Sequence, residues 1–233
     1  MPSDYARKIK ALLAKAKSTT HEEERELYQR RAEQLMVKWG VDDAMLAAEE
    51  DAEVITERFT VDMQPVGGWC VLLDNMAKGL GTVRVLAAGE LVGDFVILYL
   101  VGHRSDVNRL KMFWDLIHPQ ATIALQGYWD RYIYFMPPTE AILDWLAISK
   151  KAQFLASYGN SVGARLRAEQ HQASATTSGS DLVLFDRKKK VDDFVEENIK
   201  PGDTTYYFWE DLSARAAGWT GGAQASLLGD TDG

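Results

Sequence analysis

The residues best suited to chemistry stand in one short run, Gly102-His103-Arg104-Ser105-Asp106. An apolar segment of strand character precedes the run and a long helical pattern follows it, so the run should open a helix. The N–H groups of a helix start, beside the Arg104 guanidinium and the His103 imidazole, can hold an anion. Ser105 or Asp106 can instead cap the helix, which is the common role of polar residues there. His103, Arg104 and Asp106 are therefore the candidate catalytic residues, with a simple cap as the alternative.

Other motifs of catalytic or metal-binding type are incomplete. Residues 21–25, His-Glu-Glu-Glu-Arg, lack the second histidine of the zinc motif His-Glu-x-x-His. Residues 79–81, Gly-Leu-Gly, lack the third glycine and the Gly-Lys-Ser/Thr of phosphate-binding loops. Cys70, the single cysteine, lies in an apolar segment and is predicted to be an inert buried thiol. We predict no metal ion and no cofactor, because no Cys or His stands at ligand spacing from His103, His118 or His171.

A second candidate site is the cationic face of the N-terminal segment. Apolar residues recur at helical spacing over residues 9–16, which predicts an amphipathic helix. The candidate binding residues on this helix are Arg7, Lys8, Lys10, Lys15 and Lys17. Such a face suits the phosphates of nucleic acid or an acidic protein surface, although a solvated helix face explains the same charges. A second basic run, residues 187–190, is followed directly by acidic residues that can neutralise it.

The elements that must position these residues begin with a helical hairpin. Residues 18–20 break the first helix, and Thr20 with Glu23 has the spacing of a capping box, so a second helix should start there. That helix should end at Gly40, because glycine often adopts the left-handed conformation just after a helix. We therefore predict a helical hairpin over residues 1–42 and a solvated acidic connection over residues 43–53.

Residues 54–233 should form an α+β domain. Strand patterns cover residues 54–61, 83–87 and 95–101, with a helix over residues 69–78 and a turn at residues 89–93. Two long helices, over residues 105–134 and about 139–171, should pack antiparallel against the sheet, and Pro119 should kink or split the first. The predicted fold class is thus α+β, an N-terminal helical hairpin followed by a small, mainly antiparallel sheet packed by two long helices.

The C-terminal pattern is less regular. A polar loop is predicted at residues 174–180, followed by a short strand at 182–185, a short helix at 191–199 and an ill-defined C-terminal tail. Gly159 and Gly163 have small-xxx-small spacing on the second long helix, which in a soluble chain indicates close packing of another element.

Bulk composition excludes several classes of protein. The chain has 233 residues, of which 46% are hydrophobic, so a sizeable core can form without metals or disulfides. A net charge of −8 argues against a protein that grips phosphates with its whole surface. One cysteine permits no intramolecular disulfide, and the N-terminus has no signal-peptide pattern, so a cytoplasmic protein is expected. Apolar runs fall short of the roughly 18 residues of a membrane span. No pattern indicates the oligomeric state.

Residues 8–42 resemble the family called domain of unknown function 2786, found in phages, prophages, plasmids and actinobacteria. The matching positions are Lys8-Ile9, Leu12-Leu13, Ala16, Ser18/Thr19, Glu24, Ala32, Leu35-Met36 and Gly40-Val41. Residues 154–159, with Val162, Arg165 and Leu166, look like the companion C-terminal region of these proteins. The departure is at residues 21–24, where the family tends towards Asn and Ala and this chain has three consecutive glutamates. The resemblance implies an accessory gene of a phage or mobile element, and no established activity, cofactor or catalytic residue.

These observations favour a non-enzymatic accessory protein that binds a macromolecule, nucleic acid or a host protein, through its N-terminal hairpin. The alternative is an enzyme of unrecognised type that acts on a phosphorylated or nucleic-acid substrate near His103, Arg104 and Asp106. A third hypothesis is a structural component of a virion. The expected location, for a phage gene, is the cytoplasm of the host cell.

Overall fold

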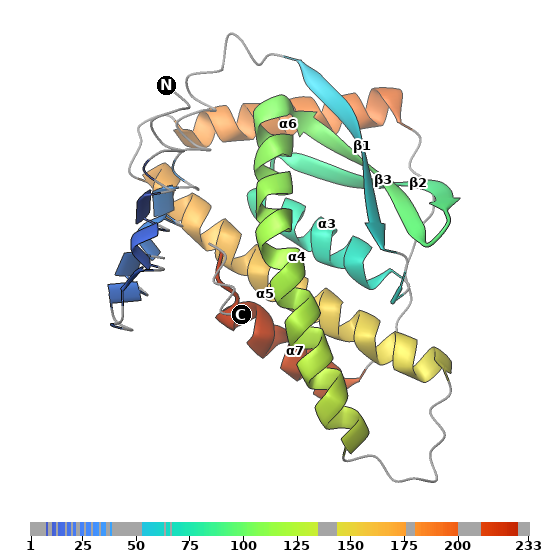
Figure 1. Cartoon of the computed structure of the whole chain (residues 1–233). Helices are drawn as coiled ribbons and strands as arrows, with labels where there is room; N and C mark the ends of the chain where they lie inside the picture. Colours follow the sequence, from blue (N-terminus) through green and yellow to red (C-terminus); the bar gives the residue numbers. More distant parts are fainter. Residues whose placement is uncertain are drawn as a thin grey trace.

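The computed structural model describes residues 53–62, 64–65, 67–134, 144–175, 180–199 and 211–227, and individual positions between residues 8 and 38. These residues include an antiparallel sheet of three strands in the order β1-β3-β2 (Figure 1). The strands are β1 (Val54–Asp62), β2 (Val83–Val92) and β3 (Phe95–His103). The helices that follow the hairpin are α3 (Gly68–Leu80), α4 (Arg104–Tyr134), α5 (Asp144–Ala175), α6 (Ser180–Asn198) and α7 (Leu212–Gln224). The predicted α+β class is confirmed.

β3 is the central strand and is buried on both faces. Its side chains alternate between the two sides of the sheet. Those that join the main core with α3 and α4 are Val96, Leu98 and Leu100. Ile97 and Val101 are also buried but point to the other side, which α6 contacts. Arg84, in register with Val101, donates from Nε to Asp192 Oδ1 of α6 at 2.6 Å. The sheet therefore lies between α3 and α4 on one face and α6 on the other.

The outer strand β2 pairs irregularly with β3. Ala87 lies opposite Leu98, whereas Leu91 lies opposite Val96, so extra residues of β2 bulge out of the ladder between these two pairs. The chain then turns at Gly93, whose φ of 60° suits glycine. The turn is therefore shorter than the predicted segment 89–93, because β2 continues to Val92.

α5 packs between α3 and α7, and glycines allow the helices to approach closely (Figure 1). A Cβ atom added to Gly159 would lie 2.5 Å from Leu72 Cα of α3, and one added to Gly163 would overlap the Asn75 carbonyl oxygen. Two glycines of α7, Gly218 and Gly222, lie equally close to the backbone of α5. The close packing predicted from Gly159 and Gly163 is confirmed. The main contacts of α5 are with these two helices, while α4 packs on the sheet.

The structure corrects one local prediction and part of a second. The strand predicted at residues 182–185 is wrong, because these residues lie within α6. A short apolar run does not distinguish a strand from a helix, and the helical spacing of the buried residues Ser180, Arg187 and Val191 shows which one forms. α4 continues through Pro119 without a break, so this proline does not split the helix. Burial of Ile117 and Ala121 on either side stabilises the helix there. No described helix is long and apolar enough to cross a membrane.

Residues 211–227, where the sequence pattern was ill-defined, contain α7 and are fixed to α4 and α5. The Gln120 side chain exchanges two hydrogen bonds with the backbone of Ser226, at 2.5 and 2.7 Å. Arg165 Nη1 donates to the Gly222 carbonyl oxygen at 3.2 Å. Asp211 caps α7 by accepting from the Ala214 N–H at 2.8 Å, and it forms an ion pair with Lys150 of α5. This segment is therefore part of the core structure.

The Asp211 cap makes the docking of α7 dependent on pH. Burial alone would raise the pKa of Asp211, but hydrogen bonds from Lys150, Ser213 and the Ala214 backbone lower its pKa from 3.8 to about 2. A carboxylate with a lowered pKa contributes stability that is complete above its unfolded pKa of 3.8 and is lost as the pH falls towards about 2.

We predict that Asp211→Asn lowers the free energy of unfolding by about 1 kcal/mol at pH 7, less than the full pKa shift implies because solvent screens the ion pair. The difference should shrink between pH 4 and pH 2, where wild-type Asp211 becomes protonated. Urea unfolding over this pH range measures it. Asp130→Asn is the control, since this exposed carboxylate of α4 accepts a hydrogen bond from Gln126 on the helix surface. A pH-independent difference for Asp211→Asn would contradict the assignment.

We predict that Gly163→Ala destabilises the protein by about 2 kcal/mol or more, because the new methyl group would overlap the Asn75 carbonyl oxygen and only a backbone shift can relieve it. Gly127→Ala in α4 is the matched control. Apart from its own helix backbone, no atom of the described residues lies within 4 Å of a Cβ at Gly127, so alanine there should stabilise the helix by about 0.5 to 1 kcal/mol. Midpoints of urea unfolding compare the two variants, and equal midpoints would show that the α3–α5 contact is not tight.

Candidate functional site

The N-terminal hairpin is helical at its described positions and turns near Thr19 and His21. The Arg25 backbone N–H of the second helix donates to the His21 carbonyl oxygen at 3.0 Å, so the helix begins just after His21. Thr19 Oγ1 donates to Glu24 Oε2 at 2.8 Å and accepts from the His21 backbone N–H at 3.3 Å. The predicted capping pair, Thr20 and Glu23, lies outside the described residues. The Thr19–Glu24 hydrogen bond links the turn to the second helix.

The two helices of the hairpin enclose a groove of about 580 Å³, here called the hairpin groove. Its lining residues are Lys8, Ala11, Leu12, Lys15, Arg31, Gln34, Leu35 and Lys38. Leu12 and Leu35 are half-buried and also pack against the main core, in which Ala32 is fully buried. Four cations thus surround an apolar floor that is continuous with the core.

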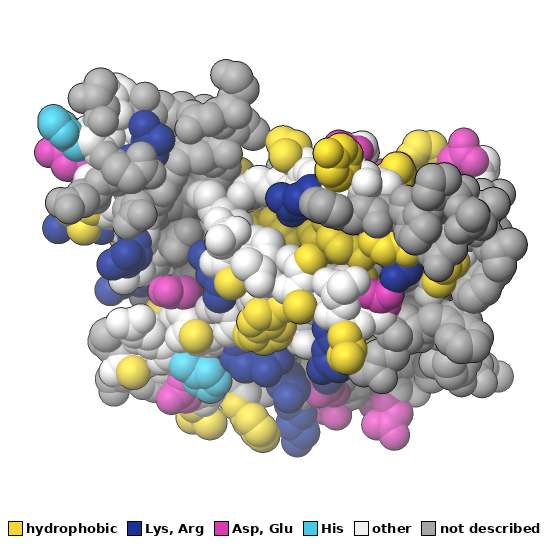
Figure 2. Space-filling view, turned by 90° about the horizontal axis from the view of Figure 1, so that it is seen from below, with side chains coloured by type: hydrophobic (Ala, Val, Ile, Leu, Met, Phe, Trp, Pro, Cys, Tyr) yellow, Lys and Arg dark blue, Asp and Glu magenta, His cyan; other side chains and the backbone are white. Residues whose placement is uncertain are grey.

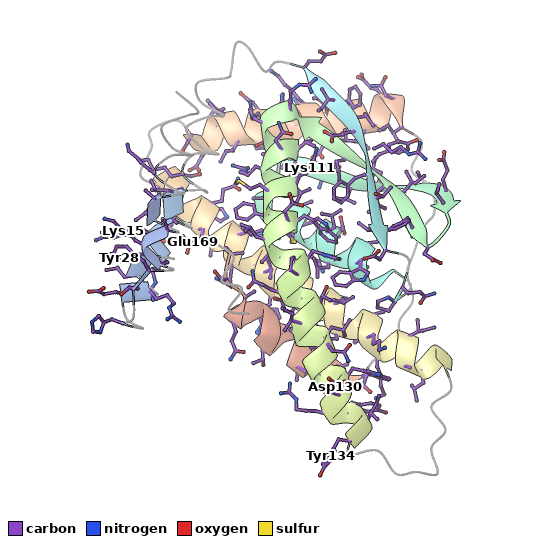
Figure 3. The ribbon with its side chains drawn as sticks, in the orientation of Figure 1. Lys15, Tyr28, Lys111, Asp130, Tyr134 and Glu169 are labelled. Carbon is purple, nitrogen blue, oxygen red and sulfur yellow. The ribbon has the colours of Figure 1, made fainter. Side chains whose placement is uncertain are left out.

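The cations of the hairpin groove come from both helices. Lys8, Lys15 and Arg31 are exposed, and Lys38 is partly buried. The Lys15 ammonium lies 5.7 Å from the centroid of the Tyr28 ring, and Figure 3 shows both side chains on the hairpin. In the space-filling view, Lys and Arg side chains appear at the left end of the molecule, where the hairpin lies (Figure 2). Asp and Glu side chains appear at the same end, so the excess of cations is a property of the hairpin groove itself.

Of the predicted binding residues, the structure brings Lys8 and Lys15 together in the hairpin groove. Arg7, Lys10 and Lys17 lie outside the described residues. The sequence analysis missed Arg31 and Lys38 of the second helix. The sequence contains a pattern that could have indicated them, because positions 31, 34, 35 and 38 share one face of a helix. Only the pairing of the two helices shows that this face meets Lys8 and Lys15.

The second candidate site lies at the junction of β3 and α4. His103 is the last residue of β3 and is 1% exposed. Asp106 in the first turn of α4 is also 1% exposed, whereas Arg104 is exposed to solvent. The three predicted catalytic residues are therefore adjacent in the chain but do not share a common solvent-facing surface.

Asp106 joins α4 and α6 through buried charges. Its Oδ2 accepts from Arg187 Nη1 of α6 at 2.9 Å, and its Oδ1 lies 3.2 Å from Arg109 Nη2 of α4. Arg187 Nη1 also donates to Ser105 Oγ at 3.1 Å. The side chains of the two arginines are at most 5% exposed. A carboxylate between two guanidinium groups compensates charges that would be costly to bury alone. This geometry favours a structural role, the fixing of α6 against the start of α4.

The other residues of metal-ligand type are also separated. Among the described residues, no three His, Cys, Asp or Glu side chains cluster closely enough to hold a metal ion. Cys70 is buried in α3. His118 packs on the Trp69 and Trp114 rings, with centroid distances of 4.5 and 5.0 Å, and its Nε2 lies 3.4 Å from Asp62 Oδ2. Its contacts are those of a side chain that covers the aromatic core.

A protein-family model matches the segment that forms the hairpin. Residues 5–43 match the model of a family described as Protein of unknown function (DUF2786). The resemblance seen in the sequence is confirmed over this segment, which includes every lining residue of the hairpin groove. The match does not extend to the sheet or to α3–α7. No curated protein and no solved structure matches the chain.

We predict that Asp106→Asn lowers the free energy of unfolding by about 3 kcal/mol, because it removes the negative charge that compensates two buried guanidinium groups. Urea unfolding monitored by tryptophan fluorescence measures the change. Arg104→Gln is the control, since its exposed side chain should leave stability within about 0.5 kcal/mol of wild type. An Asp106→Asn protein as stable as wild type would remove the structural role assigned to this carboxylate.

Proposed function

We propose that this chain is an accessory protein that binds nucleic acid through the hairpin groove. The observation that carries the proposal is the convergence of Lys8, Lys15, Arg31 and Lys38 on one groove. Cations of two helices that face one groove can contact successive phosphates of a polynucleotide, and each contact releases condensed counterions. The phage or mobile-element setting that the family resemblance implies belongs to the same proposal.

The net charge of −8 limits how the nucleic acid is held. The acidic body repels a polyanion, so binding should be confined to the hairpin, where the contacts between cations and phosphates should weaken with salt. At physiological ionic strength the Debye length is about 8 Å, which screens the hairpin from distant carboxylates only in part. The proposal therefore predicts a short binding site, set by a few phosphate contacts.

A second candidate is an acidic protein helix, and the apolar floor of the groove favours it. Ala11, Leu12 and Leu35 offer apolar surface between the cations. An amphipathic helix can place its apolar face on such a floor and its acidic residues beside the lysines. The enzyme hypothesis at His103, Arg104 and Asp106 stays a prediction, and the burial of His103 and Asp106 gives it little support.

The test compares two double variants with the same change of charge. Lys8→Gln/Lys15→Gln removes two cations of the groove, and Lys189→Gln/Lys190→Gln removes two exposed cations of α6. We expect the first variant to bind single-stranded and duplex oligonucleotides more weakly, with the slope of log affinity against log salt reduced by about 1.4 to 1.8 units. The second should bind like wild type. Fluorescence anisotropy between 20 and 200 mM salt measures both.

Two outcomes would contradict the nucleic-acid proposal. One is the absence of oligonucleotide binding by the wild-type chain at the lowest salt, where the electrostatic contribution is largest. The other is an equal loss of affinity in both double variants, which would show that only net charge matters. After either result, an acidic protein helix is the remaining candidate ligand of the hairpin groove. Titration with an acidic amphipathic peptide tests it.

A further inference from the structure

A second groove, of about 490 Å³, lies where the loop between α3 and β2 meets the C-terminal part of α5 and the N-terminal part of α6. We call it the α5–α6 groove. Its lining residues include Thr82, Arg167, Gln170, His171, Phe185 and Lys188. None of them belongs to the hairpin groove or to the Asp106 cluster, so this site is separate from the function proposed above.

Two buried oxygen atoms of the α5–α6 groove have no hydrogen-bond partner among the described residues. Thr82 is 2% exposed, and its Oγ1 makes no hydrogen bond within the described part of the chain. Gln170 Oε1 is likewise buried and without a hydrogen-bond partner there. A buried polar atom left unpaired costs about 1 to 3 kcal/mol, so two of them on one groove indicate a missing partner. Gln170 Oε1 accepts hydrogen bonds, and the Thr82 hydroxyl can both accept and donate, so the missing partner should carry at least one donor.

The groove also concentrates positive charge. Arg167 and Lys188 are exposed and line it from α5 and α6, and His171 stands one helical turn after Arg167. Lys78 adds a cation from α3, although it forms an ion pair with Asp74 at 2.6 Å. Asp181 is the carboxylate among the lining residues. Cations outnumber carboxylates on this surface, which favours an anion over a cation as ligand.

α6 supplies an apolar wall beside these charges. Positions 181, 184, 185 and 188 share the face of the helix that lines the groove, while Arg187 points away to Asp106. On this face Phe185 is 63% exposed, so its ring is accessible from solvent. An exposed aromatic ring next to cations is a surface on which a nucleobase can stack.

We infer that the α5–α6 groove binds a nucleoside monophosphate. Arg167 and Lys188 hold the phosphate, the base stacks on Phe185, and hydroxyl or amino groups of the nucleoside donate to Thr82 Oγ1 and Gln170 Oε1. The phosphate thus matches the positive charge of the groove, the base matches the exposed ring, and the donor groups of the nucleoside match the two oxygens that lack a partner.

The test titrates the full-length chain with the four ribonucleoside 5′-monophosphates, inorganic phosphate and adenosine, by calorimetry at low salt. At least one monophosphate should bind more tightly than either phosphate or adenosine. Lys188→Gln should weaken nucleotide binding at least about tenfold, the value of one hydrogen bond to a charged group. Phe185→Ala should weaken it about fivefold or more and leave the affinity for inorganic phosphate unchanged. Both side chains are exposed, so the variants should fold, and circular dichroism checks this.

Two control variants locate the binding. Lys189→Gln changes an adjacent exposed cation of α6 that does not line the groove, and Lys8→Gln/Lys15→Gln changes the hairpin. Both should bind nucleotide like wild type. The inference is overturned if no monophosphate binds at millimolar concentration, if Lys189→Gln loses as much affinity as Lys188→Gln, or if the hairpin variant loses binding. Inorganic phosphate binding as tightly as every nucleotide would overturn the nucleoside part.

Discussion

The contact of α5 with α3 and α7 is the constraint on which the other elements depend. Glycines on α5 and α7 bring helix backbones together with no side chain between them. Such contacts admit little sliding or rotation, because the nearest atoms belong to backbone rather than to flexible side chains. α3 in turn contacts β1 and β2, so the position of α5 relative to the sheet follows from the same contact. The C-terminal half of α5 then carries Arg167 and Gln170 to the edge of the α5–α6 groove.

Charged residues that are neighbours in the sequence point in different directions and have different roles. Residues 187–190 form one basic run, yet Arg187 points to Asp106 in the core and Lys188 lines a groove. Consecutive residues of a helix point about 100° apart, so one run serves a structural and a surface role together. The net charge of −8 therefore says little about local surfaces, because cations gather in two grooves of an acidic protein.

Much of the fold could be predicted from local pattern. The alternation along residues 54–61 and 95–101 and the helical period along residues 105–134 gave the elements nearly where they lie. Local pattern failed at residues 182–185, because four apolar residues fit a strand as well as the buried edge of a helix. Both candidate sites needed contacts between distant segments. Lys8 could be proposed from its own helix, whereas its neighbour Arg31 and the pairing of Asp106 with Arg187 depend on tertiary packing.

The bulge in β2 has a consequence for how the molecule behaves at high concentration. An outer strand offers backbone N–H and C=O groups to which a strand of another molecule can add, and such addition can continue into a polymer. In β2 the ladder is regular only over residues 83–87, and beyond Ala87 the backbone bends out of register. Arg84 within the regular stretch is also tied to α6 through Asp192. The irregularity therefore shortens the straight edge that β2 offers to a neighbour and limits growth of the sheet from this side, whereas β1, the other outer strand, pairs regularly with β3 along its whole length.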